Sequence, residues 1–262
     1  MQKSLKIVAA CLIFIIFLLN SVVAAASSTT LHHHMEIQLS PETSEIRVSD
    51  RIQIPEHMRN AKNPVQLEFY LHAGLAISSV QDATLAADAS EVALQSRPIS
   101  IRHYTVTVPT GQDTFTLHYG GRIHHEVKGP GQEYARSFGS TPGVIASEGV
   151  FLASASAWYP QFAEALVSFQ LEVQLPSGWD AVSQGSLLRE HDAGQSRHIV
   201  WEEKQPQDDI YLIAGRYQRY TQSTGAVNAL VYLHRYNPST VSTVLNEYLR
   251  EFIKKLEKQK PS

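Results

Sequence analysis

Histidines beside acidic residues are the first feature of this sequence that could do chemistry. A zinc hydrolase can hold its metal with two histidines one helical turn apart, in the pattern H-E-x-x-H, with the glutamate as general base. The sequence has one partial match, HEVKG at residues 125–129. Gly129 stands where the second ligand should be, and the segment runs into a Gly-Pro-Gly turn rather than a helix. We therefore predict no catalytic zinc site at His125.

A second group of histidines runs from His32 to His34 and is followed by Met35. In a strand, His32 and His34 share a face and could hold a metal ion together, and Met35 is a ligand that copper favours. Adjacent histidines point to opposite faces, so we interpret this run, like His124-His125, as strand residues with ordinary partners. We predict no metal ligand on this chain. A periplasmic metal-binding protein that uses the His32–Met35 run is kept as an alternative.

Nucleophilic catalysis has no stronger support in the sequence. There is no G-x-S-x-G motif, and no spacing of serines and histidines singles out a triad. Glu148 lies between Ser147 and Gly149 amid small and apolar residues, so it is either a buried functional carboxylate or the end of a loop. We predict no catalytic residue and keep Glu148 as the candidate substrate-binding residue.

Most of the chain alternates apolar and polar residues with period two, which predicts strands with one buried and one solvated face. The clearest segments are residues 65–72, 104–108, 115–119, 167–175, 210–214 and 227–233. Turn residues separate them, and the glycines and prolines of residues 128–147 predict a long loop. The predicted fold class is mainly β, a large antiparallel assembly of sheets shaped like a saddle or sandwich.

One helix is predicted, at the C-terminal end of the chain. Asn237-Pro238 supplies a cap and a proline suited to the first helical turn. Seven larger apolar side chains then recur at three- and four-residue steps: Val241, Val244, Leu245, Tyr248, Leu249, Phe252 and Leu256. We predict an amphipathic helix from about Ser239 to Lys258 whose apolar stripe docks on another element.

The N-terminal residues have the layout of an export signal. Residues 1–6 carry two lysines and no acid, residues 7–19 are apolar, and Ala24-Ala25-Ala26 fits a cleavage site. We predict cleavage after Ala26, with the mature protein in the periplasm or outside the cell. An uncleaved membrane anchor is the alternative, because the apolar stretch approaches the roughly 20 residues of a bilayer span. Lipidation at Cys11 fits the spacing less well.

The composition is that of a globular protein, with 18% charged and 43% hydrophobic residues. A formal net charge of −3 gives no basic field, so we predict no nucleic-acid partner. Cys11 is the single cysteine, so a mature chain without the signal has no disulfide and no thiolate chemistry.

Several stretches, taken in order, resemble one protein family. They are LHHHMEI at residues 31–37, SDRIQIP at 49–55, FYLHAGL at 69–75, LHYGG at 117–121, WYP at 158–160, LPSGW at 175–179, VSQG at 182–185 and IYLIAGRY at 210–217. The series is similar to the N-terminal β-domain of the gluzincin zinc aminopeptidases, the membrane alanyl aminopeptidase-like family. It is most similar to an exported bacterial branch, and it extends over roughly residues 31–256.

The resemblance implies a saddle-shaped antiparallel domain that precedes a helical catalytic domain. In the family, that second domain carries H-E-x-x-H and a later glutamate as zinc ligands, so the resemblance implies zinc in the catalytic domain and no cofactor on this chain. The family also binds the free amine of the substrate with a Gln/Glu pair before the Tyr-Pro motif. Aligned on Tyr159-Pro160, those positions fall at Gly149 and Phe151, which cannot hold an amine by charge, and Glu148 is adjacent.

The leading hypothesis is a non-catalytic β-domain of an exported zinc aminopeptidase-like protein, truncated or split before its catalytic domain. Residues 1–26 would be the signal, residues 27–236 the β-domain, and residues 237–262 the first helix of the catalytic domain. The expected partner is that helical domain, in cis or separately encoded. An independent secreted binding module is the other alternative.

Overall fold

The computed structural model describes residues 29–59, 62–86, 90–93, 99–125, 141–163, 165–224 and 227–234, with Glu247 and Glu251. The expected signal segment and its cleavage site after Ala26 lie outside these residues. The expected C-terminal helix, from about Ser239 to Lys258, also lies outside the described residues apart from Glu247 and Glu251. The described fold therefore gives no support for that helix. Within the described ranges, no helix is both long enough and apolar enough to cross a membrane.

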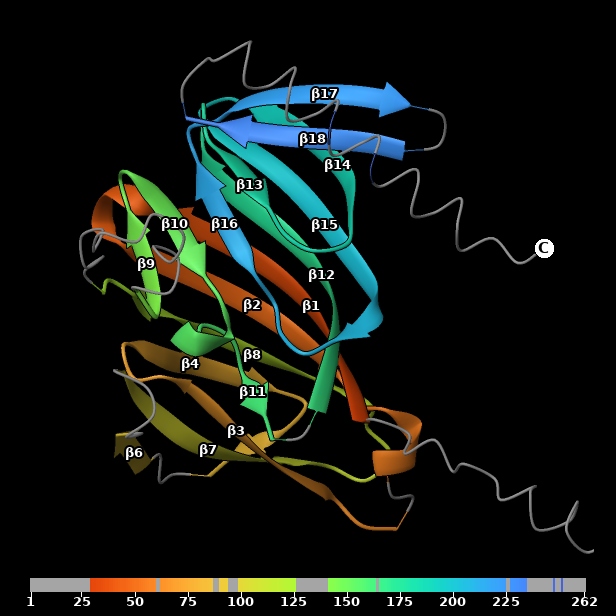
Figure 1. The fold of residues 1–262 in the computed structure, drawn as a ribbon. Helices are drawn as coiled ribbons and strands as arrows, with labels where there is room; N and C mark the ends of the chain where they lie inside the picture. Colours follow the sequence, from red (N-terminus) through yellow and green to blue (C-terminus); the bar gives the residue numbers. More distant parts are fainter. Residues whose placement is uncertain are drawn as a thin grey trace, which may run out of the picture.

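The largest sheet has seven strands in the order β14-β15-β12-β1-β2-β8-β4 (Figure 1). In chain order these are β1 (Thr29–Ser40), β2 (Glu45–Gln53), β4 (Leu75–Gln81), β8 (Thr114–Arg122), β12 (Ala165–Pro176), β14 (Ser186–Ala193) and β15 (Ser196–Gln207). The predicted antiparallel arrangement is confirmed for every neighbouring pair except β1 and β12, which run parallel from Thr29 opposite Ala165.

Two smaller sheets and a hairpin complete the described fold. The four-stranded sheet has the order β13-β16-β10-β9, and the five-stranded sheet has β11-β3-β7-β5 with β6 also paired to β7. Figure 1 shows the four-stranded sheet in the upper half of the molecule and the five-stranded sheet in the lower half. The bounds are β3 (Val65–His72), β5 (Thr84–Leu85), β6 (Ser90–Ala93), β7 (Ser100–Val108), β9 (Gly143–Ala146), β10 (Gly149–Leu152), β11 (Gln161–Phe162), β13 (Asp180–Val182), β16 (Leu212–Gly215), β17 (Gln218–Thr224) and β18 (Val227–Leu233).

Helical structure in the described ranges consists of short 3-10 turns: η1 (Pro41–Thr43), η2 (Glu56–Met58) and η4 (Ser154–Ser156), with Glu247 and Glu251 besides. The fold is therefore mainly β, as the alternating sequence pattern predicts.

One hydrophobic core joins the three larger sheets. Met35 on β1, Phe69 on β3, Phe115 on β8, Phe169 on β12 and Leu212 on β16 are all fully buried in it. The predicted period-two burial is confirmed along β2, where every second residue is buried from Ile46. Each fully buried side chain of this size contributes about 1.5–3 kcal/mol, so this core is the main source of stability.

The long loop expected over residues 128–147 is wrong at its C-terminal end. Gly143–Ala146 form β9, which pairs with β10 through a two-residue turn at Ser147-Glu148. The loop prediction followed the glycines and prolines, but the apolar run that starts at Gly143 is long enough for a short strand. Residues 126–140 lie outside the described part of the chain.

Candidate functional site

The histidine run lies on β1, in the middle of the seven-stranded sheet. Burial alternates along the strand, so His33 and Met35 are fully buried while His32 and His34 are partly exposed on the opposite face. Because successive strand residues point to opposite faces, Met35 cannot join His32 and His34 around one metal ion. The proposed copper site at His32, His34 and Met35 is therefore wrong in its third ligand.

His33 instead forms a buried pair with Asp50 of β2. Its Nδ1 lies 2.9 Å from Asp50 Oδ2, and both side chains are 0% exposed. The ring of Tyr159 meets the imidazole edge to face, with centroids 5.7 Å apart. Among the described residues, His33 Nε2, Asp50 Oδ1 and the Tyr119 hydroxyl have no hydrogen-bond partner. With no exposed surface to meet a substrate, the pair joins β1 to β2 rather than forming a catalytic dyad.

His72 and His125 form a second contact, with their Nε2 atoms 2.9 Å apart. The Gly74 N–H donates to His72 Nδ1 at 2.9 Å, so the proton of neutral His72 is on Nε2 and is donated to His125. His72 then has no free lone pair for a metal, and the contact is a hydrogen bond rather than a chelate. Burial, and next the neighbouring His125, lower the pKa of His72 to about 4. In the described ranges, no three His, Cys, Asp or Glu side chains are grouped to hold a metal ion.

The motifs that carry the family resemblance meet in space. The indole Nε1 of Trp158 donates to the Ile210 carbonyl at 3.1 Å, and Trp158 is fully buried. The next residue, Tyr159, contacts His33 from the first motif. The Arg216 guanidinium lies 5.5 Å from the ring centroid of Trp179. Segments 31–37, 158–160, 175–179 and 210–217 are therefore connected by contacts from β1 to the residues that flank β13 and β16.

The four-stranded sheet next to this junction is apolar on both faces. Its inward residues belong to the core. On the outward face, Val182 lies opposite Ile213, Ile213 opposite Phe151, and Phe151 opposite Val144. All four side chains are partly exposed. We call this row, Val144, Phe151, Ile213 and Val182, the small-sheet face.

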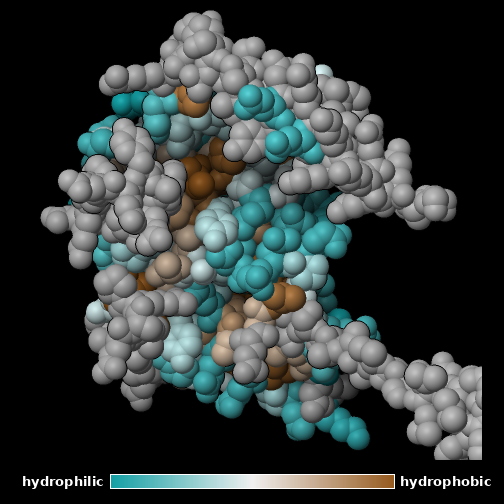
Figure 2. Space-filling model, in the orientation of Figure 1, coloured by the Kyte–Doolittle hydropathy of each residue, from teal (hydrophilic) through white to brown (hydrophobic). Residues whose placement is uncertain are grey.

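Strands that are apolar on both sides are typical of sheets covered on both sides. Figure 2, drawn in the orientation of Figure 1, shows one group of apolar residues in the upper half of the molecule and others in the lower half. The sequence signal for this face is the continuous apolar runs of the three strands, GVIA, GVFL and LIAG. Alternation predicts the third of these strands, within residues 210–214, but it does not reveal GVIA and GVFL.

Glu148 lies at the tip of the β9–β10 hairpin, beside the small-sheet face. Its side chain is exposed, and its Oε2 accepts a hydrogen bond from Ser147 Oγ at 3.0 Å. The sequence left two interpretations of Glu148 open, a buried carboxylate and a residue that ends a loop. The exposed position in the turn agrees with the second. A role in substrate binding stays a prediction. Gly149 and Phe151, the positions aligned with the amine-binding pair, both lie on β10.

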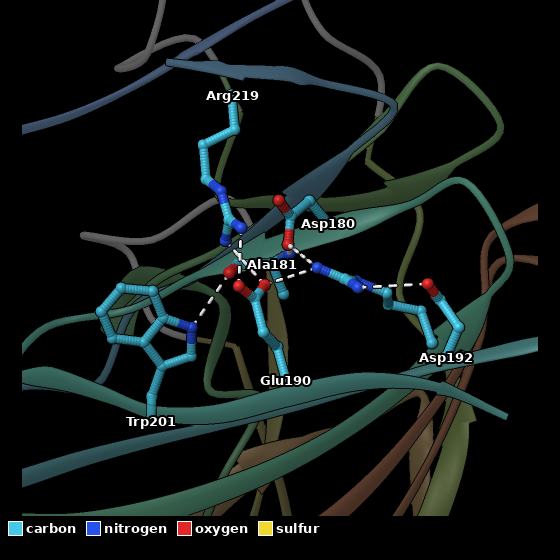
Figure 3. A network of polar contacts seen from close by, with 7 residues as sticks. Asp180, Ala181, Glu190, Asp192, Trp201 and Arg219 are labelled. Carbon is cyan, nitrogen blue, oxygen red and sulfur yellow. Dashed lines mark hydrogen bonds and ion pairs between the residues drawn. The ribbon is translucent and has the colours of Figure 1, made fainter. Parts of the chain in front are cut away.

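A network of ion pairs connects the β17–β18 hairpin to the seven-stranded sheet (Figure 3). Arg219 of β17 donates two hydrogen bonds of 2.6 Å to the carboxylate of Glu190 on β14. Arg197 of β15 also contacts Glu190, and it pairs with Asp192 at 3.4 Å and with Asp180 at 3.9 Å. The hydrogen bonds from Arg219 lower the pKa of Glu190, whereas burial raises the pKa of Asp180. This arginine network fixes the hairpin that leads to residue 234.

The outward face of the seven-stranded sheet is polar and concave. A groove of about 900 Å³ runs along it. Its lining includes Glu36 and Gln38 of β1, Arg47 of β2, His118 of β8, Glu172 of β12, and His191 and His198 of β14 and β15. The acids are paired in part, since Glu172 lies 3.5 Å from His34 and 3.6 Å from Arg189. Polar and charged side chains from several strands therefore line this groove.

No protein-family model and no curated protein matches the sequence. Solved structures with a similar fold include three of an M1 zinc metallopeptidase from Deinococcus radiodurans. A point mutant bound to a Tyr-Ser-Ala substrate aligns at TM-score 0.49 and 14% identity, over 80% of this chain and 50% of that one. A second structure of the mutant gives a TM-score of 0.48 and 13% identity, and the unmutated enzyme gives 0.48 and 14%, each over 78% of this chain and 46% of that one. This chain thus spans about half the length of those proteins, and a likeness this low decides nothing about activity.

Proposed function

We propose that this chain is the non-catalytic N-terminal β-domain of an exported zinc aminopeptidase-like protein, and that it supports and partly covers a helical catalytic domain. In this proposal the zinc ligands belong to the catalytic domain, supplied in cis or as a separate chain. The protein acts in the periplasm or outside the cell, where its N-terminal signal would direct it.

The observation that carries the proposal is the spatial junction of the family-like motifs. Four motifs, spread from residue 31 to residue 217, are joined by Trp158, Tyr159 and Trp179 into one packed unit. These contacts between the motifs support the fold that the family resemblance implies.

The small-sheet face supports the second part of the proposal, a surface for the catalytic domain. Phe151 stands where the resembling family places an amine-binding side chain, and it continues an apolar row with Ile213 and Val144. An apolar row can pack against a neighbouring domain but cannot bind an ammonium group by charge. We therefore assign this face to domain packing and leave substrate chemistry to the partner.

The test begins with the DNA that follows codon 262. In the proposal it encodes, in any reading frame, H-E-x-x-H and a distal glutamate in a helical domain. That domain is then produced separately and titrated against the purified β-domain by calorimetry, with aminoacyl-anilide hydrolysis followed in parallel. We expect a complex, and we expect Phe151→Asp and Ile213→Asp to weaken it at least tenfold, about 1.4 kcal/mol.

The matched control is Gln174→Asp, which adds the same charge on the polar outward face of the seven-stranded sheet. It should leave the affinity unchanged, and circular dichroism should show that all variants keep their β-structure. A complex that tolerates both small-sheet substitutions would remove the assigned packing face. The lack of any encoded metallopeptidase domain would refute the proposed function itself and favour an independent binding module.

A further inference from the structure

Two histidines lie directly opposite each other on the β14–β15 hairpin. The strand register pairs His191 with His198, and their rings stack with centroids 5.0 Å apart and planes 10° apart. Both line the groove on the outward face of the seven-stranded sheet. Their neighbours Glu190 and Arg197 belong to the arginine network on the other face, as strand alternation requires. The two imidazoles are thus isolated from the ion pairs beneath them.

This pair differs from the histidines of β1 in how its nitrogens are used. His32 Nδ1 lies 2.9 Å from Ser168 Oγ, and His34 Nε2 lies 3.5 Å from Glu172. By contrast, neither His191 nor His198 has a hydrogen-bond or ion-pair partner in the described part of the chain. Their ring nitrogens therefore remain available as ligands, whereas a metal at His32 and His34 would have to displace existing contacts.

We propose that His191 and His198 form a surface chelating site for a divalent transition-metal ion, with Cu²⁺ bound most tightly and solvent completing the coordination. The donor set selects the metal class, because imidazole suits copper, nickel and zinc, whereas calcium and magnesium prefer oxygen ligands. Affinity for one set of nitrogen ligands rises through the divalent series to a maximum at copper. The proposal does not depend on the proposed function.

The spacing of the two strands suits a chelate. Residues directly opposite each other in an antiparallel pair have Cβ atoms about 4.5–5.5 Å apart. Bonds from zinc to imidazole nitrogen are about 2.0–2.1 Å each, so one ion between two such rings spans a comparable distance. His191 is exposed and His198 partly exposed, so both rings can rotate toward a shared ion without disturbing the core.

The hairpin holds the pair in place before any metal binds. Ala193 pairs with Ser196 across a two-residue loop, and Gly194 takes a φ of +63° there, a conformation that suits glycine. One position further along, Asp192 pairs with Arg197 at 3.4 Å. A site whose strands are already fixed loses little conformational entropy on binding, which favours affinity.

The test is calorimetric titration of the purified protein, without a histidine tag, with Cu²⁺ and then with Zn²⁺. We expect one Cu²⁺ site that is weakened at least tenfold by His191→Ala and by His198→Ala, and weaker binding of Zn²⁺ at the same site. Electron paramagnetic resonance of the copper-loaded protein should show coupling to two imidazole nitrogens in the wild type and to one in each variant. Both side chains are on the surface, so folding should be retained, which circular dichroism checks.

The matched control is the double variant His32→Ala/His34→Ala, which removes two histidines from the same face of the sheet. It should keep the Cu²⁺ affinity and the two-nitrogen signal. A wild-type titration curve for His191→Ala or His198→Ala would overturn the proposal. So would a loss of the site in the His32→Ala/His34→Ala control, since it would move the ligands to β1.

Discussion

The molecule has two outward sheet faces of opposite character. Across the four-stranded sheet, Phe151 and Ile213 form part of an apolar row. On the outward face of the seven-stranded sheet, the groove is lined by polar side chains such as Gln38, Arg47 and His198. Both sheets contribute to the same core on their inward side. The difference therefore lies in the outward side chains, which form an apolar row on the small sheet and are mainly polar on the large one.

The two faces suit different kinds of contact. A polar outward face costs nothing to expose, so it can carry isolated ligands such as the His191–His198 pair. Apolar area that stays in contact with water has a free-energy cost, and burial against another surface removes that cost. The experiments below test the two faces and the buried layer between them, in order of expected effect.

The largest effect is expected in the buried layer, at the His33–Asp50 pair. Asp50→Ala leaves the His33 imidazole without its partner in a site that is 0% exposed. Breaking a buried pair in this way costs about 3–5 kcal/mol, which is a large fraction of a domain's net stability of about 5–15 kcal/mol. Urea denaturation of the wild type and the variant measures the change.

The double variant His33→Leu/Asp50→Leu is the informative control. Replacing both partners with apolar side chains is often neutral, so it should recover most of the stability lost in Asp50→Ala. If the single substitution costs less than about 1 kcal/mol, a value typical of surface pairs, the layer between the faces is wetter than the structure indicates.

The sequence predicts the strands well and their partners poorly. Period-two alternation identifies β3, β8 and β12 because it depends only on neighbouring residues. The parallel pairing of β1 with β12 and the contact of His33 with Asp50 depend on the order of strands in the sheet, which no local pattern contains. For the same reason the alternation pattern could predict that Met35 points to the other face of the sheet from His32 and His34. It could not predict that Glu172 is the partner of His34.

The small-sheet face illustrates a different limit. Its strands are three or four residues long, and alternation predicts only β16, within residues 210–214. The glycines and prolines up to Gly143 favoured a loop where β9 lies. Glu148 was recognisable as a residue between small neighbours, but only the β9–β10 register shows that it occupies an exposed turn. Short strands are stabilised by their neighbours in the sheet, so their existence is decided by tertiary contacts.

Acidification tests the contact between His72 and His125. Because the pKa of His72 falls to about 4 in the folded protein, against an ordinary value near 6.5, the unfolded chain binds the proton more readily between those values. The stabilisation is therefore complete above about pH 6.5 and is lost as the pH falls toward 4, by up to about 3 kcal/mol. Urea denaturation from pH 7 to pH 4 measures it, relative to His72→Gln.

The control His72→Gln removes this titration and leaves all other acids and histidines in place. The difference in stability between the two proteins should shrink steadily below pH 6.5. A difference that stays constant down to pH 4 would mean that His72 takes up its proton as easily in the folded protein as in the unfolded one.

Substitution on the small-sheet face should affect stability only modestly. Phe151 is partly exposed, so Phe151→Ser forfeits about half of the 1.5–3 kcal/mol of a fully buried aromatic side chain, or about 1 kcal/mol. It should also lower the binding of a hydrophobic dye to the native protein, because it interrupts the apolar row. Gln38→Ser on the other outward face should change neither quantity. A cost above about 3 kcal/mol would show that Phe151 is packed as tightly as a core residue.

The smallest effect is expected on the polar face, at Glu172. This carboxylate accepts from Gln170 at 2.9 Å and lies near His34 and Arg189, so it has more partners than any other acid named on this face. Its side chain is nevertheless 34% exposed and that of Arg189 65%, so water and salt screen the attraction. We expect Glu172→Gln to cost less than about 1 kcal/mol, and to cost less still in 1 M salt. A loss as large as that of Asp50→Ala, measured by the same urea denaturation, would mean that the groove excludes water and that the two outward faces differ less than their side chains suggest.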